Sequence, residues 1–189
     1  MNWTIPKSAY LFFVSIGLPI ANLVKRPRKF TGGPQKNTIY NASVNRESNL
    51  KINGETGNTI EFWLKKDASS WYASGRKEVI FDITTLAGLD SHQEARLSVE
   101  LEKPSSAAAS PFLFTYRSGS TGVIQERLGS TSITSASVGD NKWHHYAITT
   151  QISASSTLYK LYVDGVLDST SAKSHTLGPV DRAITGSIG

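Results

Sequence analysis

The sequence has no cysteine, and it lacks long stretches rich in alanine, leucine, glutamate and lysine. Without cysteine, a disulfide framework, a thiolate zinc site and a cysteine nucleophile are all excluded. The absence of cysteine also favours synthesis in a reducing cytoplasm. Because no segment of useful length has helical periodicity, while serine, threonine and glycine are abundant, the composition favours strands and turns.

Positive charge is concentrated in one place. The formal net charge is +5, and four of the basic residues form the cluster Lys25, Arg26, Arg28 and Lys29. Without that cluster the remaining chain has a net charge of +5 − 4 = +1. The basicity is therefore local, and it gives no indication of a specific nucleic-acid partner.

Residues 1–37 differ from the rest of the chain and are predicted to form an N-terminal arm. Residues 9–24 carry no charge, and the basic cluster follows them at once. Pro27 and the basic cluster stand where a signal peptide would need small cleavage-site residues. A transmembrane helix needs about 20 apolar residues, and Gly17 and Pro19 interrupt this shorter run. We rank a membrane or signal segment second, and expect an apolar arm that packs on its own domain or on another subunit. The apolar residues of this assembly arm are Leu11, Phe12, Phe13, Val14 and Ile16.

Residues 38–189 are predicted to form one domain of short strands. Alternation of apolar and polar residues predicts strands over 60–64, 79–83, 97–101, 143–149 and 159–163, with weaker candidates over 111–117 and 122–128. In the first strand, Ile60, Phe62 and Leu64 should face the core, and Trp63 should face away. Asp164-Gly165 between apolar residues predicts a tight hairpin. Many strands with one apolar face each must pair with a second sheet, so we expect an antiparallel β-sandwich.

Three segments carry a family resemblance in order and spacing: 62–67 (FWLKKD), 141–151 (NKWHHYAITTQ) and 158–169 (LYKLYVDGVLDS). They resemble the laminin-G-like jelly roll of the concanavalin A-like lectin/glucanase superfamily. The resemblance covers roughly 37–189 and implies an all-β, antiparallel jelly-roll sandwich. The family usually continues into further closing strands after a segment like 184–189. The chain is therefore expected to be a fragment, or to have that edge filled by the arm or by a neighbouring subunit.

Glycosidases of this superfamily carry an E-x-D-x-E arrangement on one strand, and the sequence has no such arrangement. Glu78 and Asp82 are four residues apart and are expected on the same face, too far apart to act together. Ser98 replaces the first acid in the segment that ends in Glu100 and Glu102, and we expect both of these carboxylates to be solvated. We therefore predict no catalytic residues and no enzymatic activity.

Two adjacent histidines, His144 and His145, should point to opposite faces of a strand, so they cannot share a metal. No cofactor is expected, and calcium is the one metal that the resemblance allows, with oxygen ligands on loops. Asp140 and Asn141 are the candidates for it, although a turn before Trp143 also explains them. The resemblance also allows sugar binding on exposed aromatic side chains. We predict Trp71, Tyr72 and Tyr116 for that role, and Trp63 is a further stacking candidate.

The resemblance extends to lectin-like virion proteins of bacteriophages. The expected function is accordingly a non-catalytic structural or adhesion module of a virion, associated with capsid or tail. Its expected partners are other protein subunits, bound through the arm, and a cell-surface glycan. The alternative is a carbohydrate-binding adhesin or lectin domain of a bacterial surface protein, located extracellularly, and a glycoside hydrolase comes third.

Overall fold

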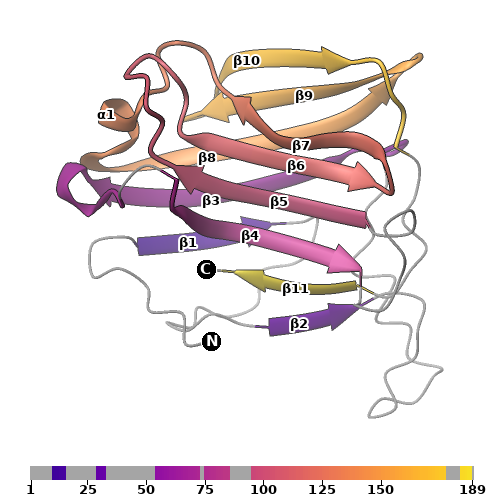
Figure 1. The fold of residues 1–189 in the computed structure, drawn as a ribbon, viewed down its shortest axis with the longest axis horizontal. Helices are drawn as coiled ribbons and strands as arrows, with labels where there is room; N and C mark the ends of the chain where they lie inside the picture. The colour runs from indigo at the N-terminus through magenta and orange to yellow at the C-terminus, as the bar shows by residue number, and fades with distance from the viewer. Residues whose placement is uncertain are drawn as a thin grey trace.

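The computed structural model describes residues 10–15, 29–32, 54–72, 75–85, 95–177 and 184–188. These residues form two antiparallel sheets that face each other (Figure 1). The five-stranded sheet has the order β1-β3-β8-β9-β10 and the six-stranded sheet the order β2-β11-β4-β5-β6-β7. The all-β sandwich predicted from the alternating pattern is confirmed.

A strand lies at every position predicted from the sequence, and among the predicted ranges only 111–117 starts outside its strand, by one residue. The strands are β1 (Tyr10–Ser15), β2 (Lys29–Gly32), β3 (Asn58–Asp67), β4 (Lys77–Thr85), β5 (Ala95–Glu102), β6 (Phe112–Ser118), β7 (Thr121–Leu128), β8 (Asp140–Ser153), β9 (Ser156–Val163), β10 (Val166–Lys173) and β11 (Ile184–Ile188). Short helical turns lie at η2 (Ala68–Ser70) and α1 (Ser135–Val138). None of the helices in the described segments is long and apolar enough to cross a membrane.

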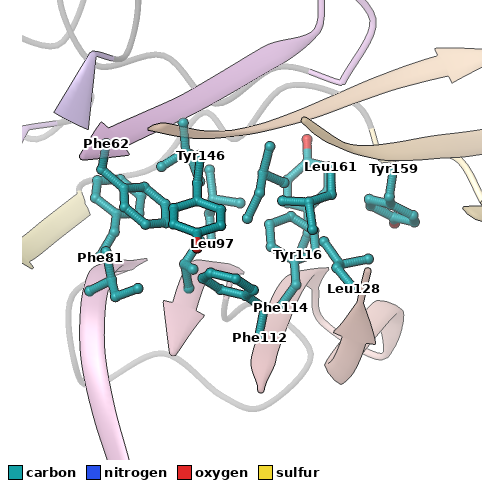
Figure 2. Close-up of a cluster of buried hydrophobic side chains, with 14 of the residues drawn as sticks. Phe62, Phe81, Leu97, Phe112, Phe114, Tyr116, Leu128, Tyr146, Tyr159 and Leu161 are labelled. Atoms are coloured by element: carbon teal, nitrogen blue, oxygen red, sulfur yellow. The ribbon is translucent and has the colours of Figure 1, made fainter. Parts of the chain in front are cut away.

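The core lies between the sheets and is rich in aromatic rings (Figure 2). Ile60, Phe62 and Leu64 are buried on one face of β3, as their alternation predicts. The rings of Phe62 and Tyr146 stack with centroids 5.6 Å apart. The ring of Phe112 lies 4.8 Å from that of Tyr146, so β3 and β8 contact β6 across the sandwich. Aromatic pairs at such separations stabilise the fold by more than the burial of their apolar area alone.

The hairpin predicted at Asp164-Gly165 joins β9 to β10. Both residues have positive φ, 49° at Asp164 and 80° at Gly165. A type I′ turn needs positive φ at both central positions, and its twist matches that of the two strands. The sequence signal and the backbone geometry therefore agree.

The N-terminal segment adds an edge strand to each sheet. β1 pairs antiparallel with β3, with Phe12 opposite Trp63, and β2 pairs with β11. β11 lies between β2 and β4, so the segment after which the family usually continues is interior to its sheet. Of the predicted arm residues, Leu11, Phe12, Phe13 and Val14 belong to β1 and Lys29 begins β2. Ile16, Lys25, Arg26 and Arg28 lie outside the described residues.

One expectation about β5 is wrong. The Glu100 carboxylate was expected to be solvated, and Glu100 is buried. Only 8% of the Glu100 side chain is exposed. β5 lies between β4 and β6, not at an edge. Alternation specifies the face to which a side chain points, but it does not specify whether that face is covered.

Candidate functional site

The acidic residues considered for catalysis each contact a cation. Both carboxylate oxygens of Glu78 accept hydrogen bonds from the Lys66 ammonium, at 2.8 and 2.9 Å. Asp82 accepts two from the Arg96 guanidinium, at 2.8 and 3.2 Å. The hydrogen bond to Asp82 is the main reason why the pKa of Arg96 is raised. Both carboxylates therefore form ion pairs with cations of the same domain.

Glu78 and Asp82 do not lie on the same face, so that expectation is wrong. Glu78 is opposite the core residue Leu101, whereas Asp82 is opposite Ser98 on the outer face. The register shifts between Val79 and Phe81. A bulge that adds one residue reverses the alternation beyond it, because the side-chain period of a strand is two.

Glu100 and Glu102, the second pair of acids, also meet arginines. Glu100 Oε1 lies 3.5 Å from Arg96 Nη2, and Glu102 Oε2 lies 3.5 Å from Arg127 Nη2. Glu100 Oε2 is buried and has no hydrogen-bond partner among the described residues. A retaining glycosidase needs one protonated and one ionised carboxyl about 5–5.5 Å apart across the sugar bond. In the described segments, the acids weighed for this role are held by cations instead.

The two histidines have separate partners. His144 Nδ1 lies 2.7 Å from Asp164 Oδ2, and its Nε2 lies 3.3 Å from Asp140 Oδ1. Burial lowers the pKa of His144, but the hydrogen bonds and charges of Asp164 and Asp140 outweigh it, so the pKa is raised. His145 instead lies 3.5 Å from Glu61. The histidines therefore belong to different environments, as their alternation predicts.

The calcium candidates Asp140 and Asn141 are the first two residues of β8. Asp140 Oδ1 accepts a hydrogen bond from the Lys142 backbone N–H at 2.9 Å and also contacts His144. Asn141 is exposed and has a positive φ of 63°. Within the described ranges, no three His, Asp or Glu side chains are grouped so as to hold a metal ion. The Asp140 carboxylate is therefore engaged by the Lys142 backbone and by His144.

The three predicted sugar-binding aromatics are not brought together as an exposed face. Tyr116 is only 1% exposed, and its hydroxyl accepts a hydrogen bond from Asn58. Burial raises the pKa of Tyr116 to about 12. Its prediction as an exposed ligand residue is wrong, because Phe112, Phe114 and Tyr116 alternate onto the core face of β6.

Trp71 is half-buried, and both its indole N–H and its ring contact other residues of the domain. Its indole N–H donates to the Ser135 carbonyl at 3.1 Å. The Lys66 ammonium lies 4.5 Å from the centre of its ring, a cation–π distance. Tyr72 is exposed, and its role in sugar binding stays a prediction.

Exposed aromatic side chains lie instead on the outer face of the five-stranded sheet, the side away from the core. Trp63 is 45% exposed, and its ring centroid is 5.2 Å from that of His145. Trp143 is also exposed. Alternation in β3 predicts that Trp63 faces away from the core, whereas the exposure of Trp143 was not predicted from the sequence.

Comparison with known proteins assigns this sandwich to a family. Residues 36–187 match a laminin-G family model described as the concanavalin A-like lectin/glucanases superfamily. No curated protein matches the chain significantly.

Among the solved structures that are similar to this chain, three show how distant the similarity is. A Bacillus licheniformis β-glucanase is 15% identical, with a TM-score of 0.34, over 95% of this chain and 84% of its own. A Pseudoalteromonas carrageenovora κ-carrageenase, solved with a κ-carrageenan oligotetrasaccharide, is 9% identical, with a TM-score of 0.30, over 70% and 54% of the two chains. A prokaryotic β-1,3-1,4-glucanase (lichenase) from a mouse hindgut metagenome is 11% identical, with a TM-score of 0.28, over 85% of each. These similarities are too distant to indicate a shared activity.

Proposed function

Because this chain belongs to the concanavalin A-like lectin/glucanase superfamily, we propose that it is a non-catalytic structural and adhesion module of a bacteriophage virion, associated with the capsid or tail. The observation that carries the non-catalytic part is the pairing of acids with cations. Glu78 is held by Lys66, and Asp82 is held by Arg96. A carboxylate held by a permanent cation is a poor proton donor, because the cation favours its ionised form.

The virion part is supported by the sequence. The chain has no cysteine, its N-terminal segment is apolar and then basic, and its domain resembles lectin-like domains of phage particles. Exposed Trp63 and Trp143 suit a module that contacts another molecule.

A hydrolysis assay tests the non-catalytic part. The purified chain, incubated with a panel of β-glucans, should release no reducing sugar above a heat-denatured control. Release that disappears in Glu78→Gln or Asp82→Asn would establish a hydrolase instead. Both variants should be checked for folding by circular dichroism, because each removes an ion-pair partner.

Immunogold labelling tests the location. An antiserum against the chain should label phage particles in electron micrographs of the native source. Labelling of bacterial surfaces without particles would support the alternative, a carbohydrate-binding adhesin of a surface protein. That alternative is favoured by the exposed indole of Trp63 on the outer face of the five-stranded sheet.

The proposed subunit contacts involve the basic cluster that follows the apolar run. The backbones of β1 and β2 pair within the chain, so deleting the whole segment would confuse folding with assembly. The triple variant Lys25→Glu, Arg26→Glu and Arg28→Glu changes only residues between those strands. We expect it to fold normally by circular dichroism and to lose assembly in light scattering. Unchanged assembly would contradict a charge-dependent subunit contact.

A further inference from the structure

A small residue, Ala147, lies among larger side chains on the outer face of the five-stranded sheet. In the register of β3, β8 and β9, Ala147 is directly opposite Glu61 on one side and Tyr162 on the other. Trp63 and His145 form the next outward-facing pair along β3 and β8. Directly opposite residues share a face, and diagonal neighbours lie about 7–8 Å apart. The five residues therefore form one patch with a low centre, which we call the Ala147 face.

The Ala147 face combines an exposed aromatic ring with partly exposed polar groups. Trp63 is 45% exposed, more than Tyr72 or Trp143, which are each 39% exposed. His145 Nε2 lies 3.5 Å from Glu61 Oε2, and both side chains are partly exposed. The tilted contact with the His145 ring supports one side of the indole. The indole is thus held in place by its neighbours while much of it stays accessible to a ligand.

The composition of the patch indicates the chemistry of its occupant. Lys65 and Lys160 lie on the same face, opposite Trp143 and Thr149 respectively. Charged groups of both signs are therefore interleaved with the aromatic ones, whereas the core of a protein–protein interface is depleted of charged residues. A ligand with apolar C–H faces and hydroxyl edges suits such a surface, because each kind of group meets its counterpart.

We propose that the Ala147 face binds a pyranose unit of a neutral glycan. The apolar face of the sugar ring packs on Trp63 above Ala147, and its hydroxyls donate to Glu61. Tyr162 borders the site on the side of β9. This inference rests on the adhesion part of the proposed function and adds to it the place of binding and the ligand class. It shares Trp63 with the stacking candidates predicted from the sequence, but it does not include Tyr116, which is buried.

Titration of the full chain with cellohexaose, laminarihexaose and maltohexaose tests the site, with tryptophan fluorescence as the readout. At least one hexasaccharide should bind saturably. Trp63→Ala should then weaken binding by about tenfold, as truncation of an aromatic anchor does. Ala147→Leu should weaken it similarly by filling the low centre, whereas Trp63→Tyr should retain most of it. Ile124→Ala is the matched control, because Ile124 is an exposed apolar residue on β7 of the other sheet and should leave binding unchanged.

Three results would overturn the site: no saturable binding of any hexasaccharide, unchanged binding by Trp63→Ala, or conversion of an oligomer to a monomer by Trp63→Ala. The last result would mean that the face holds a second copy of the chain. An adhesion assay on host cells separates this failure from that of the proposed function. If the wild-type chain adheres and Trp63→Ala adheres equally, the site is wrong and the adhesion role stands. If the wild-type chain does not adhere, the proposed adhesion role is itself wrong.

Discussion

The ion pair between Lys66 and Glu78 links the two sheets across one end of the core. Lys66 on β3 has no exposed side-chain surface, and Glu78 on β4 is 14% exposed. The Lys66 ammonium also contacts the Ser70 carbonyl at 3.4 Å and the ring of Trp71. Because a buried charge is costly without a partner, removing Glu78 should destabilise the fold far more than removing an exposed ion pair.

The expected magnitude follows from the burial. Breaking a buried pair by removing one partner costs about 3–5 kcal/mol. Ser70 and Trp71 stay in contact with the ammonium, and the partial exposure of Glu78 lets water approach. We therefore expect Glu78→Gln to lower the free energy of unfolding by about 2–3 kcal/mol. In a domain of this size that loss lowers Tm by roughly 5–10 °C.

Urea unfolding followed by tryptophan fluorescence measures the change. The double variant Lys66→Met/Glu78→Leu should recover most of the loss, because replacing a buried pair by apolar residues is often neutral or stabilising. Lys142→Met is the control: Lys142 is 77% exposed and lies 3.6 Å from Asp140, so about 0.5 kcal/mol or less is expected. The reasoning is refuted if Glu78→Gln unfolds like the wild type, or if the double variant is as unstable as the single one.

Three further predictions concern other contacts. The pKa of His144 is raised in the folded protein, so the protonated ring stabilises the fold. This stabilisation is fully present below the unfolded pKa of about 6.5, and it is lost as the pH rises through the folded pKa. His144→Gln should therefore cost about 1–2 kcal/mol at pH 5.5 and less at pH 9 in urea unfolding, and an equal cost at both pH values would contradict this. At Gly122 (φ 127°) a Cβ atom would lie 2.2 Å from the Tyr116 carbonyl oxygen, whereas at Gly75 (φ 88°) it would meet no atom within 4 Å. Gly122→Ala should cost about 3 kcal/mol or more and Gly75→Ala only about 1–2 kcal/mol, and equal shifts in Tm would refute the steric argument. Asp168 accepts hydrogen bonds from the Ser130 backbone N–H at 2.7 Å and from its hydroxyl at 2.6 Å. Asp168→Ala should cost about 1–3 kcal/mol in thermal unfolding, more than Ser130→Ala, which keeps the backbone donor; the reverse order would count against it.

Local pattern determined much of the fold. In β3 the alternation of Ile60, Phe62 and Leu64 specified the strand and its buried face, because side chains of a strand point to alternate sides. Asp164-Gly165 specified the hairpin, because few residues other than Gly, Asn and Asp accept its positive φ values. The outward orientation of Trp63, on which the proposed glycan site depends, followed from the same alternation.

Only the tertiary structure decided which strand faces are buried and which side chains contact one another. The register shift in β4 separates Glu78 from Asp82, and spacing along the sequence does not show a bulge. The burial of Glu100 depends on what packs over the outer face of β5, and the contact of Lys66 with Glu78 depends on how the two sheets stack. The pairing of β1 with β3 and of Ala147 with Glu61 joins segments far apart along the chain. Such contacts depend on the packing of the whole sandwich, which the alternation within one strand does not contain.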